Sequence, residues 1–408
     1  MAETRIITGI DIGTTAVRAL IAEESEDGSS PIFIGYGAVP VEGIRRGIVV
    51  NMEKAVKAIS DAVEIAEEMA EVHIESATVG IAGDHIKSIN SHGVIGVSRS
   101  DNEIGEKDSQ KAIEAASAVA IPNDREIIHV LPQEYTIDEQ SGIKNPVGMT
   151  GVRLEVEVHI VTAAVTSARN IYRSFERCEI GIDHLVLQSL ADSYSVLSGN
   201  EEDMGVVLID IGGDITDVAV FYNGSIRHTG VVPLGGRNVT NDIAIGLRTS
   251  VGQADELKLK YGSAMTALVN PDEMMLVPSA TGKEPRQISR NVLSTIIEPR
   301  MEEILSLASR EIQKSNPPEA LAAGIVITGG GALLPGMVEL AEQIFDMPVK
   351  IGLPSGLDGL PEEMNSPELS TAIGLVTYGF QNEPMDAAKR GGLSGLFRKI
   401  EGWISKNF

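Results

Sequence analysis

The chain of 408 residues exceeds what one compact core usually holds, so two or more domains are expected. Its net formal charge of −25 excludes a general binder of nucleic acid, and its single cysteine excludes an internal disulfide. No apolar run reaches the roughly 18 residues that a spanning helix needs, and the first residues lack a secretory signal, which together predict a soluble, cytoplasmic protein.

The first expected strand, Arg5–Ile12, leads into a glycine turn with two threonines. Glycine after a strand lets backbone N–H groups approach a phosphate closely. The hydroxyls of Thr14 and Thr15 add donors, and the carboxylate of Asp11 could hold a hydrated magnesium ion. Asp11, Gly13, Thr14 and Thr15 are therefore candidate site residues, although an ordinary hairpin turn has the same pattern.

A helix is expected at Met52–Glu71, where Ala, Ile and Val recur at helical spacing, and a short apolar strand at Thr78–Gly83. The following stretch, residues 86–151, is more polar and has a helix-start signal at Asp108. It ends before another strand-like run, Glu155–Val165. This change of composition predicts a small inserted domain.

A second glycine turn, between expected strands Val206–Asp210 and Asp217–Tyr222, repeats the Asp-x-Gly arrangement of the first. An acidic hairpin turn is the simpler interpretation of either turn alone. If the two turns face each other across a cleft, they would clasp a polyphosphate, with Asp11 and Asp210 sharing one magnesium ion. The candidate residues of the second turn are Gly212, Gly213 and Thr216.

A third glycine turn follows the expected strand Ile325–Thr328 and precedes an expected helix, Met337–Ile344. Its residues Gly329, Gly330 and Gly331 could let a flat base lie against the backbone, although a tight strand-to-helix turn also explains them. Short buried strands alternating with helices indicate an α/β fold. The three turns together predict a site for phosphates and a nucleoside.

The C-terminal residues reverse the charge of the chain: Lys389–Phe408 carries +4 against −29 for the rest. A polar linker precedes them, and apolar residues from Gly391 onward fall within an arc of roughly 140° on a helix. This pattern predicts an amphipathic helix that lies on an anionic membrane, rather than a helix that packs on the protein core. The expected membrane-facing residues are Leu396, Phe397, Ile400, Trp403 and Ile404.

The segments His129–Tyr135, Gly142–Gly148 and Thr240–Ala244, together with the glycine turns, resemble the FtsA family of bacterial cell-division proteins. This family belongs to the ATPase superfamily of actin, sugar kinases and heat-shock chaperones. The resemblance covers nearly the whole chain. It implies an actin-like α/β fold with two lobes, ATP between them, an FtsA-type inserted subdomain and a C-terminal amphipathic helix.

The resemblance also implies a division of the chain. The expected parts are a first lobe (1–83 and 166–200), the insert (84–165), a second lobe (201–235 and 322–380), its outer subdomain (236–321), a linker (381–390) and the terminal helix (391–408).

By the same resemblance, Gln188 would orient the attacking water, Asp255 and Lys258 would lie beside the ribose and base, and Gly235 and Gly236 would form another nucleotide-side turn. Asp214 departs from the family pattern, which usually has glycine there. An extra carboxylate near the phosphates would weaken nucleotide binding or hydrolysis unless it points at the metal or away from the site.

The implied function is an actin-like protein that binds ATP and Mg²⁺, hydrolyses ATP slowly at most, and polymerises on the cytoplasmic face of the membrane at the division site. Its implied partners are FtsZ, further copies of itself, anionic lipids and other division proteins. Arg286, Arg290 and Arg300 are candidates for the acidic tail of FtsZ. The alternatives are a pilus-assembly actin-like protein and a sugar kinase, although no segment specifies the catalytic base that a kinase needs.

Overall fold

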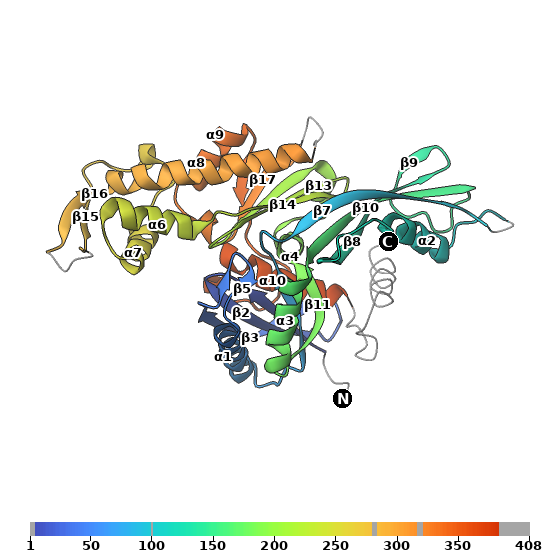
Figure 1. Cartoon of the computed structure of the whole chain (residues 1–408), viewed down its shortest axis with the longest axis horizontal. Helices are drawn as coiled ribbons and strands as arrows, with labels where there is room; N and C mark the ends of the chain where they lie inside the picture. The colour runs from blue at the N-terminus through green and yellow to red at the C-terminus, as the bar shows by residue number, and fades with distance from the viewer. Residues whose placement is uncertain (1–4, 99–100, 280–283, 316–320, 383–408) are drawn as a thin grey trace.

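The computed structural model describes residues 5–98, 101–279, 284–315 and 321–382. Figure 1 shows a first lobe around α1 and β3 at the bottom and the sheet of a second lobe, with β13, β14 and β17, above it. An insert with β8, β9 and α2 extends to the right, and an outer subdomain with α6, α7 and the β15–β16 hairpin extends to the left.

The first lobe contains a five-stranded sheet in the order β11-β6-β1-β2-β3. The first three strands of the chain form an antiparallel meander, and β6 and β11 extend the sheet in parallel from β1. The strands are β1 (Ile6–Ile12), β2 (Ala16–Glu24), β3 (Pro31–Pro40), β6 (Ser76–Ile81) and β11 (Gly181–Leu187), and a small hairpin joins β4 (Ile44–Arg45) to β5 (Ile48–Val49).

The sheet of the second lobe repeats this topology, in the order β14-β13-β12-β17-β18. Its strands are β12 (Val206–Ile211), β13 (Thr216–Tyr222), β14 (Ser225–Val232), β17 (Ile325–Thr328) and β18 (Val349–Ile351). Every residue of β12 and β17 is buried, as expected for short apolar strands that are covered on both faces. The repeat places the turns after β1 and β12 at equivalent ends of the two sheets.

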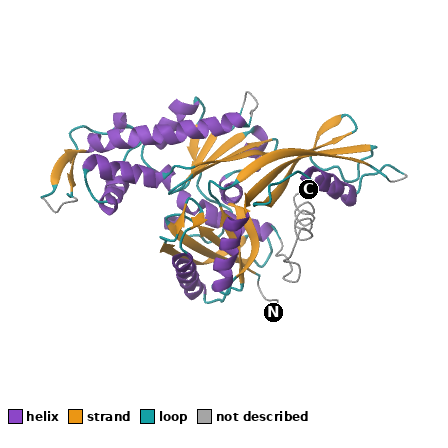
Figure 2. Cartoon of the chain, viewed as in Figure 1, coloured by secondary structure: helices purple, strands orange, loops and turns teal. Residues whose placement is uncertain are grey.

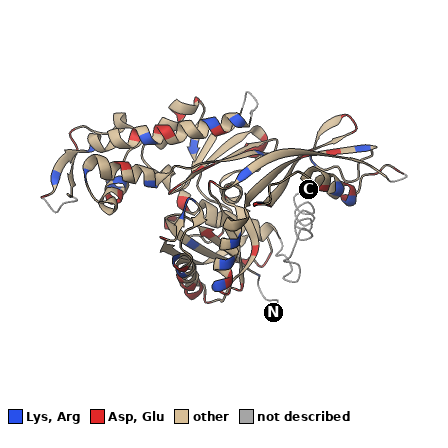
Figure 3. Ribbon diagram, in the orientation of Figure 1, with Lys and Arg blue, Asp and Glu red and all other residues tan. Residues whose placement is uncertain are grey.

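Helices cover both sheets, and charged residues gather on helices such as α1 and α8, whereas the central strands are mostly uncharged (Figure 3). Two helices pack tightly against each other: a Cβ at Gly374 of α10 would lie 1.9 Å from the carbonyl oxygen of Ala191 in α4. The helices of the two lobes are α1 (Met52–Ala70), α3 (Val165–Arg177), α4 (Gln188–Val196), α5 (Gly199–Met204), α9 (Met337–Phe345) and α10 (Ser370–Gln381).

The insert is a curved four-stranded sheet in the order β7-β10-β8-β9 with α2 on one face (Figure 2). Its sheet also contacts β14 of the second lobe, where Ser88 Oγ donates to the carbonyl of Thr229 at 2.9 Å. Its elements are β7 (Lys87–Gly96), α2 (Glu106–Ser117), β8 (Arg125–Ile137), β9 (Gln140–Ile143) and β10 (Arg153–Ala164).

The outer subdomain is mainly helical, with the long helix α8 packed against α6. It consists of α6 (Gly236–Leu247), α7 (Val251–Tyr261), β15 (Met274–Val277), β16 (Arg286–Ser289) and α8 (Arg290–Lys314). Four short 3₁₀ turns complete the described chain: η1 (Thr266–Leu268), η2 (Gly330–Leu333), η3 (Glu362–Met364) and η4 (Pro367–Leu369).

The elements predicted within the described residues are all present, with ends that differ by at most two residues. The helix predicted to start at Asp108 begins at Glu106, because Asp108 caps it from inside: its carboxylate accepts from the N–H of Gly105 at 3.1 Å. No helix in the described ranges is both long and apolar enough to cross a membrane. The predicted membrane-facing residues, Leu396 to Ile404, lie outside the described residues.

Candidate functional site

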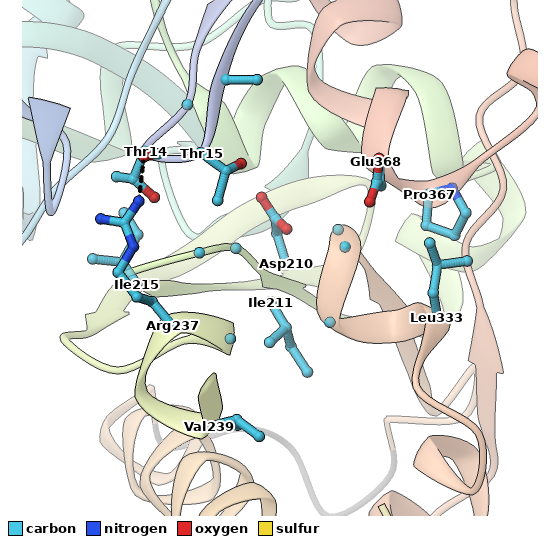
Figure 4. A pocket seen from close by; sticks show the side chains of 18 of the residues that line it. Thr14, Thr15, Asp210, Ile211, Ile215, Arg237, Val239, Leu333, Pro367 and Glu368 are labelled. Carbon is cyan, nitrogen blue, oxygen red and sulfur yellow. Dashed lines mark hydrogen bonds between the residues drawn. The ribbon is translucent and has the colours of Figure 1, made fainter. Parts of the chain in front are cut away.

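The three glycine turns, which are far apart in the sequence, meet around one cavity of about 760 Å³. Figure 4 shows Thr14 and Thr15 on one side of it, Pro367 and Leu333 on the other, and Asp210 between them. Most of the predicted site residues line this cavity: Asp11, Gly13, Thr14, Thr15, Gln188, Asp210, Gly212, Gly213, Gly236, Asp255, Lys258, Gly329, Gly330 and Gly331.

Two of the residues predicted for the nucleotide site, Thr216 and Gly235, do not line the cavity. Thr216 is fully buried and donates its hydroxyl to the carbonyl of Leu234 at 2.9 Å. Gly235 lies behind the second turn, where a Cβ would come within 2.6 Å of the carbonyl oxygen of Gly212. Both residues therefore support the second turn from behind instead of facing a ligand.

Asp11 ends β1 with its carboxylate held from two sides. Its Oδ1 accepts from Nε2 of Gln188 at 2.7 Å, and its Oδ2 lies 3.6 Å from Nη1 of Arg18. Burial raises the pKa of Asp11 to about 6, although the nearby charge of Arg18 opposes this shift. Gln188 thus belongs to the polar network that lines the cavity next to the first turn.

Asp210 ends β12 in a more acidic environment. Its Oδ1 has no hydrogen-bond partner among the described residues. Burial and the charge of Asp11 raise the pKa of Asp210, and burial together with Asp210 raises that of Asp217. Asp192 of α4 is also fully buried beside them; its Oδ1 accepts from the hydroxyl of Thr371 at 2.7 Å. An unpartnered carboxylate oxygen of this kind is suited to a cation or to a water bound to one.

The third turn presses directly on the second. Gly329 has φ of 79°, and a Cβ there would lie 1.9 Å from Oδ1 of Asp210. A Cβ at Gly331 would lie 2.3 Å from Cγ2 of Ile211, whereas one at Gly330 would meet only the end of Glu368, at 3.3 Å. Gly329 and Gly331 are thus required by packing, while Gly330 leaves its cavity side open.

The other end of the cavity is mostly apolar, with a polar cluster beside it. Nζ of Lys258 donates to Oγ1 of Thr240 and to Oδ1 of Asp255, each at 2.7 Å. Burial opposes the ionisation of Asp255, but the bonds from Lys258 outweigh it and lower the pKa of that carboxyl. Apolar walls and hydroxyl-binding charges suit a base and a ribose. The apolar residues at this end are Val239, Val251, Leu259, Met301, Leu333 and Leu334.

Sequence reasoning missed Arg18, whose side chain is 14% exposed and lies between Asp11 and Glu368. Burial opposes its charge, but Asp11 and other neighbours raise the pKa of Arg18 overall. The signal was present in the sequence: in an antiparallel hairpin, residue 18 pairs with residue 11 across the turn. An arginine inside an otherwise apolar strand indicates a carboxylate at the position that pairs with it across the hairpin.

Asp214, the departure from the family pattern, is paired with Arg237, a second residue that the sequence did not single out. Nη1 of Arg237 lies 3.1 Å from Oδ1 of Asp214, so the extra carboxylate is neutralised within its own lobe. Asp214 also does not line the cavity, whereas Arg237 does. Asp214 therefore lies away from the cavity, which is one of the two cases in which the sequence predicts no weakening of nucleotide binding.

The three arginines predicted to bind an acidic tail lie in the outer subdomain and already have partners. Arg300 pairs with Asp242 at 2.6 Å, and Arg290 pairs with Glu273 at 2.8 Å. Arg286 donates to the carbonyl of Leu247. An incoming carboxylate would therefore exchange with existing partners instead of meeting free guanidinium groups.

Among the described residues, no group of three or more His, Cys, Asp or Glu side chains is arranged to hold a metal ion directly. The arrangement at the cavity is instead two separate carboxylates, Asp11 and Asp210, on opposing turns. Such a pair can hold a hydrated cation through its water molecules, as the sequence predicts for Mg²⁺.

Comparison with known families gives two matches. The family model "Cell division protein FtsA" matches residues 207–374, and the model "SHS2 domain inserted in FTSA" matches residues 83–162. Cell division protein FtsA of Pseudomonas aeruginosa is 42% identical over 413 residues, which cover 99% of this chain and 98% of that protein. FtsA of Escherichia coli strain K12 is 37% identical over 418 residues, which cover 100% and 99%.

Solved structures with the same fold are more distant in sequence. A chain of the PilM-PilN type IV pilus biogenesis complex has a TM-score of 0.67 at 16% identity, covering 93% of this chain and 99% of that one. MreB5 of Spiroplasma citri bound to ADP has a TM-score of 0.53 at 16% identity, covering 92% and 96%. These matches confirm the predicted actin-like α/β fold with its insert.

Proposed function

The chain belongs to the FtsA family of cell-division proteins, and we propose that it binds ATP with Mg²⁺, assembles on the cytoplasmic face of the membrane at the division site and holds FtsZ filaments there. The observation that carries the nucleotide part is the meeting of three distant glycine turns around one cavity of about 760 Å³. An MreB with the same fold has been solved with ADP and with AMPPNP, which supports a nucleotide in this cavity.

In this proposal the turns at Thr14 and Gly213 bind the phosphates through backbone N–H groups and hydroxyls. Asp11 and Asp210 hold the magnesium ion through water, and the ion screens the phosphate charge. The unpartnered Oδ1 of Asp210 supports this assignment. Asp255 and Lys258 bind the ribose, and the apolar end takes the base. Gly235 and Thr216 keep the second turn in shape.

We propose that this site hydrolyses ATP slowly and that hydrolysis regulates assembly. Gln188 is the residue that would orient a water, but an amide cannot take a proton from it at neutral pH. The donation from Gln188 to Asp11 at 2.7 Å shows that the amide is already engaged beside the phosphate end. We infer a nucleotide-dependent assembly switch and not a metabolic enzyme, because the relatives that match the whole chain are cell-division proteins.

The division of the chain proposed from the sequence gives each part a task. The insert, residues 84–165, contributes to contacts between copies in a filament, and the outer subdomain, residues 236–321, receives the FtsZ tail at Arg286, Arg290 or Arg300. The terminal segment anchors the assembly through Leu396, Phe397, Ile400, Trp403 and Ile404. Its charge of +4, against −29 for the preceding chain, supports an anionic lipid surface as its partner.

The two alternatives receive less support. The pilus-assembly match is 16% identical and supports the fold alone, whereas relatives at 37–43% identity across the chain are cell-division proteins. A sugar kinase of the same superfamily would need a catalytic base in a substrate cleft, and the cavity described here is accounted for by nucleotide-binding groups.

Sedimentation with anionic vesicles tests the proposed function. The full chain, with Mg²⁺ and ATP, should sediment with the vesicles and carry FtsZ filaments with it. Ile400→Glu should abolish sedimentation, because it places a charge in the apolar arc of the terminal helix, while leaving ATP binding intact. Glu401→Gln, a neighbouring change outside that arc, is the control and should still sediment. Attachment of Ile400→Glu at the level of the unaltered chain would contradict the proposal.

A further inference from the structure

The two phosphate turns, which belong to different lobes, are in direct contact. The N–H of Asp214 donates to Oγ1 of Thr14 at 3.2 Å. A Cβ at Gly213 would lie 2.6 Å from Cγ2 of Thr15 and 2.7 Å from Oγ1 of Thr14. Only glycine permits this approach, so the lobes are closed on each other at the phosphate end of the cavity.

A charged pair of the second lobe reinforces this contact. Arg237, in the first turn of α6, donates from Nη2 to the carbonyl oxygen of Thr14 at 2.9 Å, as the dashed line in Figure 4 shows. Its Nη1 lies 3.1 Å from Oδ1 and 3.2 Å from Oδ2 of Asp214. One guanidinium thus joins a carboxylate of its own lobe to the backbone of the other lobe.

The carboxylate of Asp214 also reaches the first lobe. Its Oδ2 accepts from the N–H of Arg46 at 3.2 Å. The turn that carries this donor is fixed by packing, because Arg46 has φ of 48° and a Cβ at Gly47 would lie 2.1 Å from the carbonyl oxygen of Ala82. The donor is therefore expected to stay with the first lobe if the lobes separate.

In this closed arrangement the side chains of Asp214 and Arg237, from one lobe, each bind a backbone group of the other lobe. The Asp214 side chain is 11% exposed and that of Arg237 is 37% exposed, so the pair is partly shielded from water. Bonds with one charged partner are stronger than neutral ones, and both side-chain bonds across the lobes are of this kind. Because the two opposite charges stay paired within their own lobe, the arrangement adds no net charge next to the phosphates.

We propose that Asp214 and Arg237 form a latch between the lobes, and that opening of this latch limits the release of bound nucleotide. The inference rests on the proposed nucleotide function. Separation of the lobes breaks the bonds to Thr14 and Arg46 together, and a nucleotide between the glycine turns leaves only after that separation. The latch acts on the rate of opening, so it affects the release of ADP and ATP alike.

Release of a fluorescent N-methylanthraniloyl-ADP, loaded on the full chain with Mg²⁺ and displaced by excess ADP, tests the latch. Asp214→Asn and Arg237→Gln should each raise the dissociation rate about three- to tenfold, since each weakens a partly exposed, charge-assisted contact. The double variant should be less affected than the product of the two single effects, because both residues serve one contact. Asp61→Asn, which removes an exposed pair with Lys57 on α1, is the control and should change nothing.

The latch predicts that Asp214→Asn and Arg237→Gln both raise the dissociation rate, which distinguishes it from a simple charge effect on the phosphates. If the two side chains acted only through their charge on the phosphates, removal of the Asp214 anion and removal of the Arg237 cation would change the dissociation rate in opposite directions. Opposite directions, or two unchanged rates, would overturn the latch.

A second measurement does not depend on nucleotide. In the nucleotide-free chain, Arg237→Gln should speed hydrogen exchange at the amides of Arg46 and Asp214, which donate across the lobes, and leave α1 unchanged. Unchanged exchange at both amides would overturn the latch even if the chain binds no nucleotide. Failure of the unaltered chain to bind nucleotide, with faster exchange in the variant, would instead contradict the proposed function.

Discussion

The hairpins that carry Asp11 and Asp210 have the same topology but opposite charge environments. Across the first hairpin Asp11 pairs with Arg18, whereas across the second Asp210 pairs with Asp217. Each partner lies seven residues after its aspartate. The two hairpins therefore share the position of the paired residue but not its charge. The first turn therefore compensates its own carboxylate, and the second has an excess of negative charge.

The difference indicates what each lobe contributes to the site. Asp11 is held by Arg18 and Gln188, so it is positioned before any ligand arrives. Asp210 has an unpartnered oxygen, and burial and neighbouring carboxylates raise the pKa values of both Asp210 and Asp217. The second lobe thus gains more from a bound cation than the first. This asymmetry can be tested one turn at a time.

The largest expected effect comes from the third turn, which supports the second turn and not the first. Gly329→Ala should destabilise the fold by about 2–4 kcal/mol. The positive φ of residue 329 disfavours any side chain, and the added Cβ would clash with the carboxylate of Asp210. Gly330→Ala is the matched control, since its Cβ would meet only the flexible end of Glu368. Thermal unfolding should show a clearly lower Tm for the first variant alone; equal Tm values would remove the third turn from its supporting role.

The next effect concerns the two carboxylates themselves. Asp210→Asn should weaken Mg²⁺-dependent ATP binding about 10–100-fold, and Asp11→Asn should weaken it less, because Arg18 already compensates Asp11. Both changes keep the shape of the side chain. Calorimetry with and without Mg²⁺ measures the difference. An equal or larger loss for Asp11→Asn would show that the two turns share the ion evenly.

The smallest effect is a dependence on pH. A carboxyl whose pKa is raised on folding stabilises the fold below its unfolded value of about 3.9 and loses that contribution as pH rises through its folded value. For Asp11 the pKa in the folded protein is about 6. When no cation is bound, its stabilising contribution is therefore lost between a pH of about 3.9 and a pH of about 6. A cation binds the ionised form, and its contribution therefore has the opposite dependence on pH.

Lowering the pH from about 7.5 to about 5.5 should therefore weaken Mg²⁺-ATP binding about three- to tenfold. Asp11→Asn should reduce this dependence in part, because it removes one of the two carboxyls that titrate in this window: the pKa is raised to about 6 for Asp11 and to about 7 for Asp210. Titrations of ATP into both proteins at each pH provide the comparison. A dependence that is as steep in the variant as in the unaltered chain would assign the titration to the ligand or to another group.

The three turns could be predicted from the sequence because each is a local pattern of a buried strand followed by glycine. Arg18 could be recognised only once the register of the first hairpin, which pairs it with Asp11, was considered. Arg237 could not be recognised, since its contact depends on the approach of two lobes. Thr216 and Gly235 match the pattern but face away from the cavity, because a turn needs residues behind it as well as in front. The contact of the insert with β14 likewise joins segments with no shared sequence signal.

The proposed function requires that a magnesium nucleotide bind between the opposing turns of the two lobes. The most direct test is a crystal structure of the full chain with Mn²⁺ in place of Mg²⁺ and a non-hydrolysable ATP analogue, in which anomalous scattering locates the metal. We expect a single metal peak in the cavity, bound through water to Asp210 and Asp11, with the base between α7 and η2. A nucleotide or a metal bound elsewhere, with this cavity holding neither, would contradict the account.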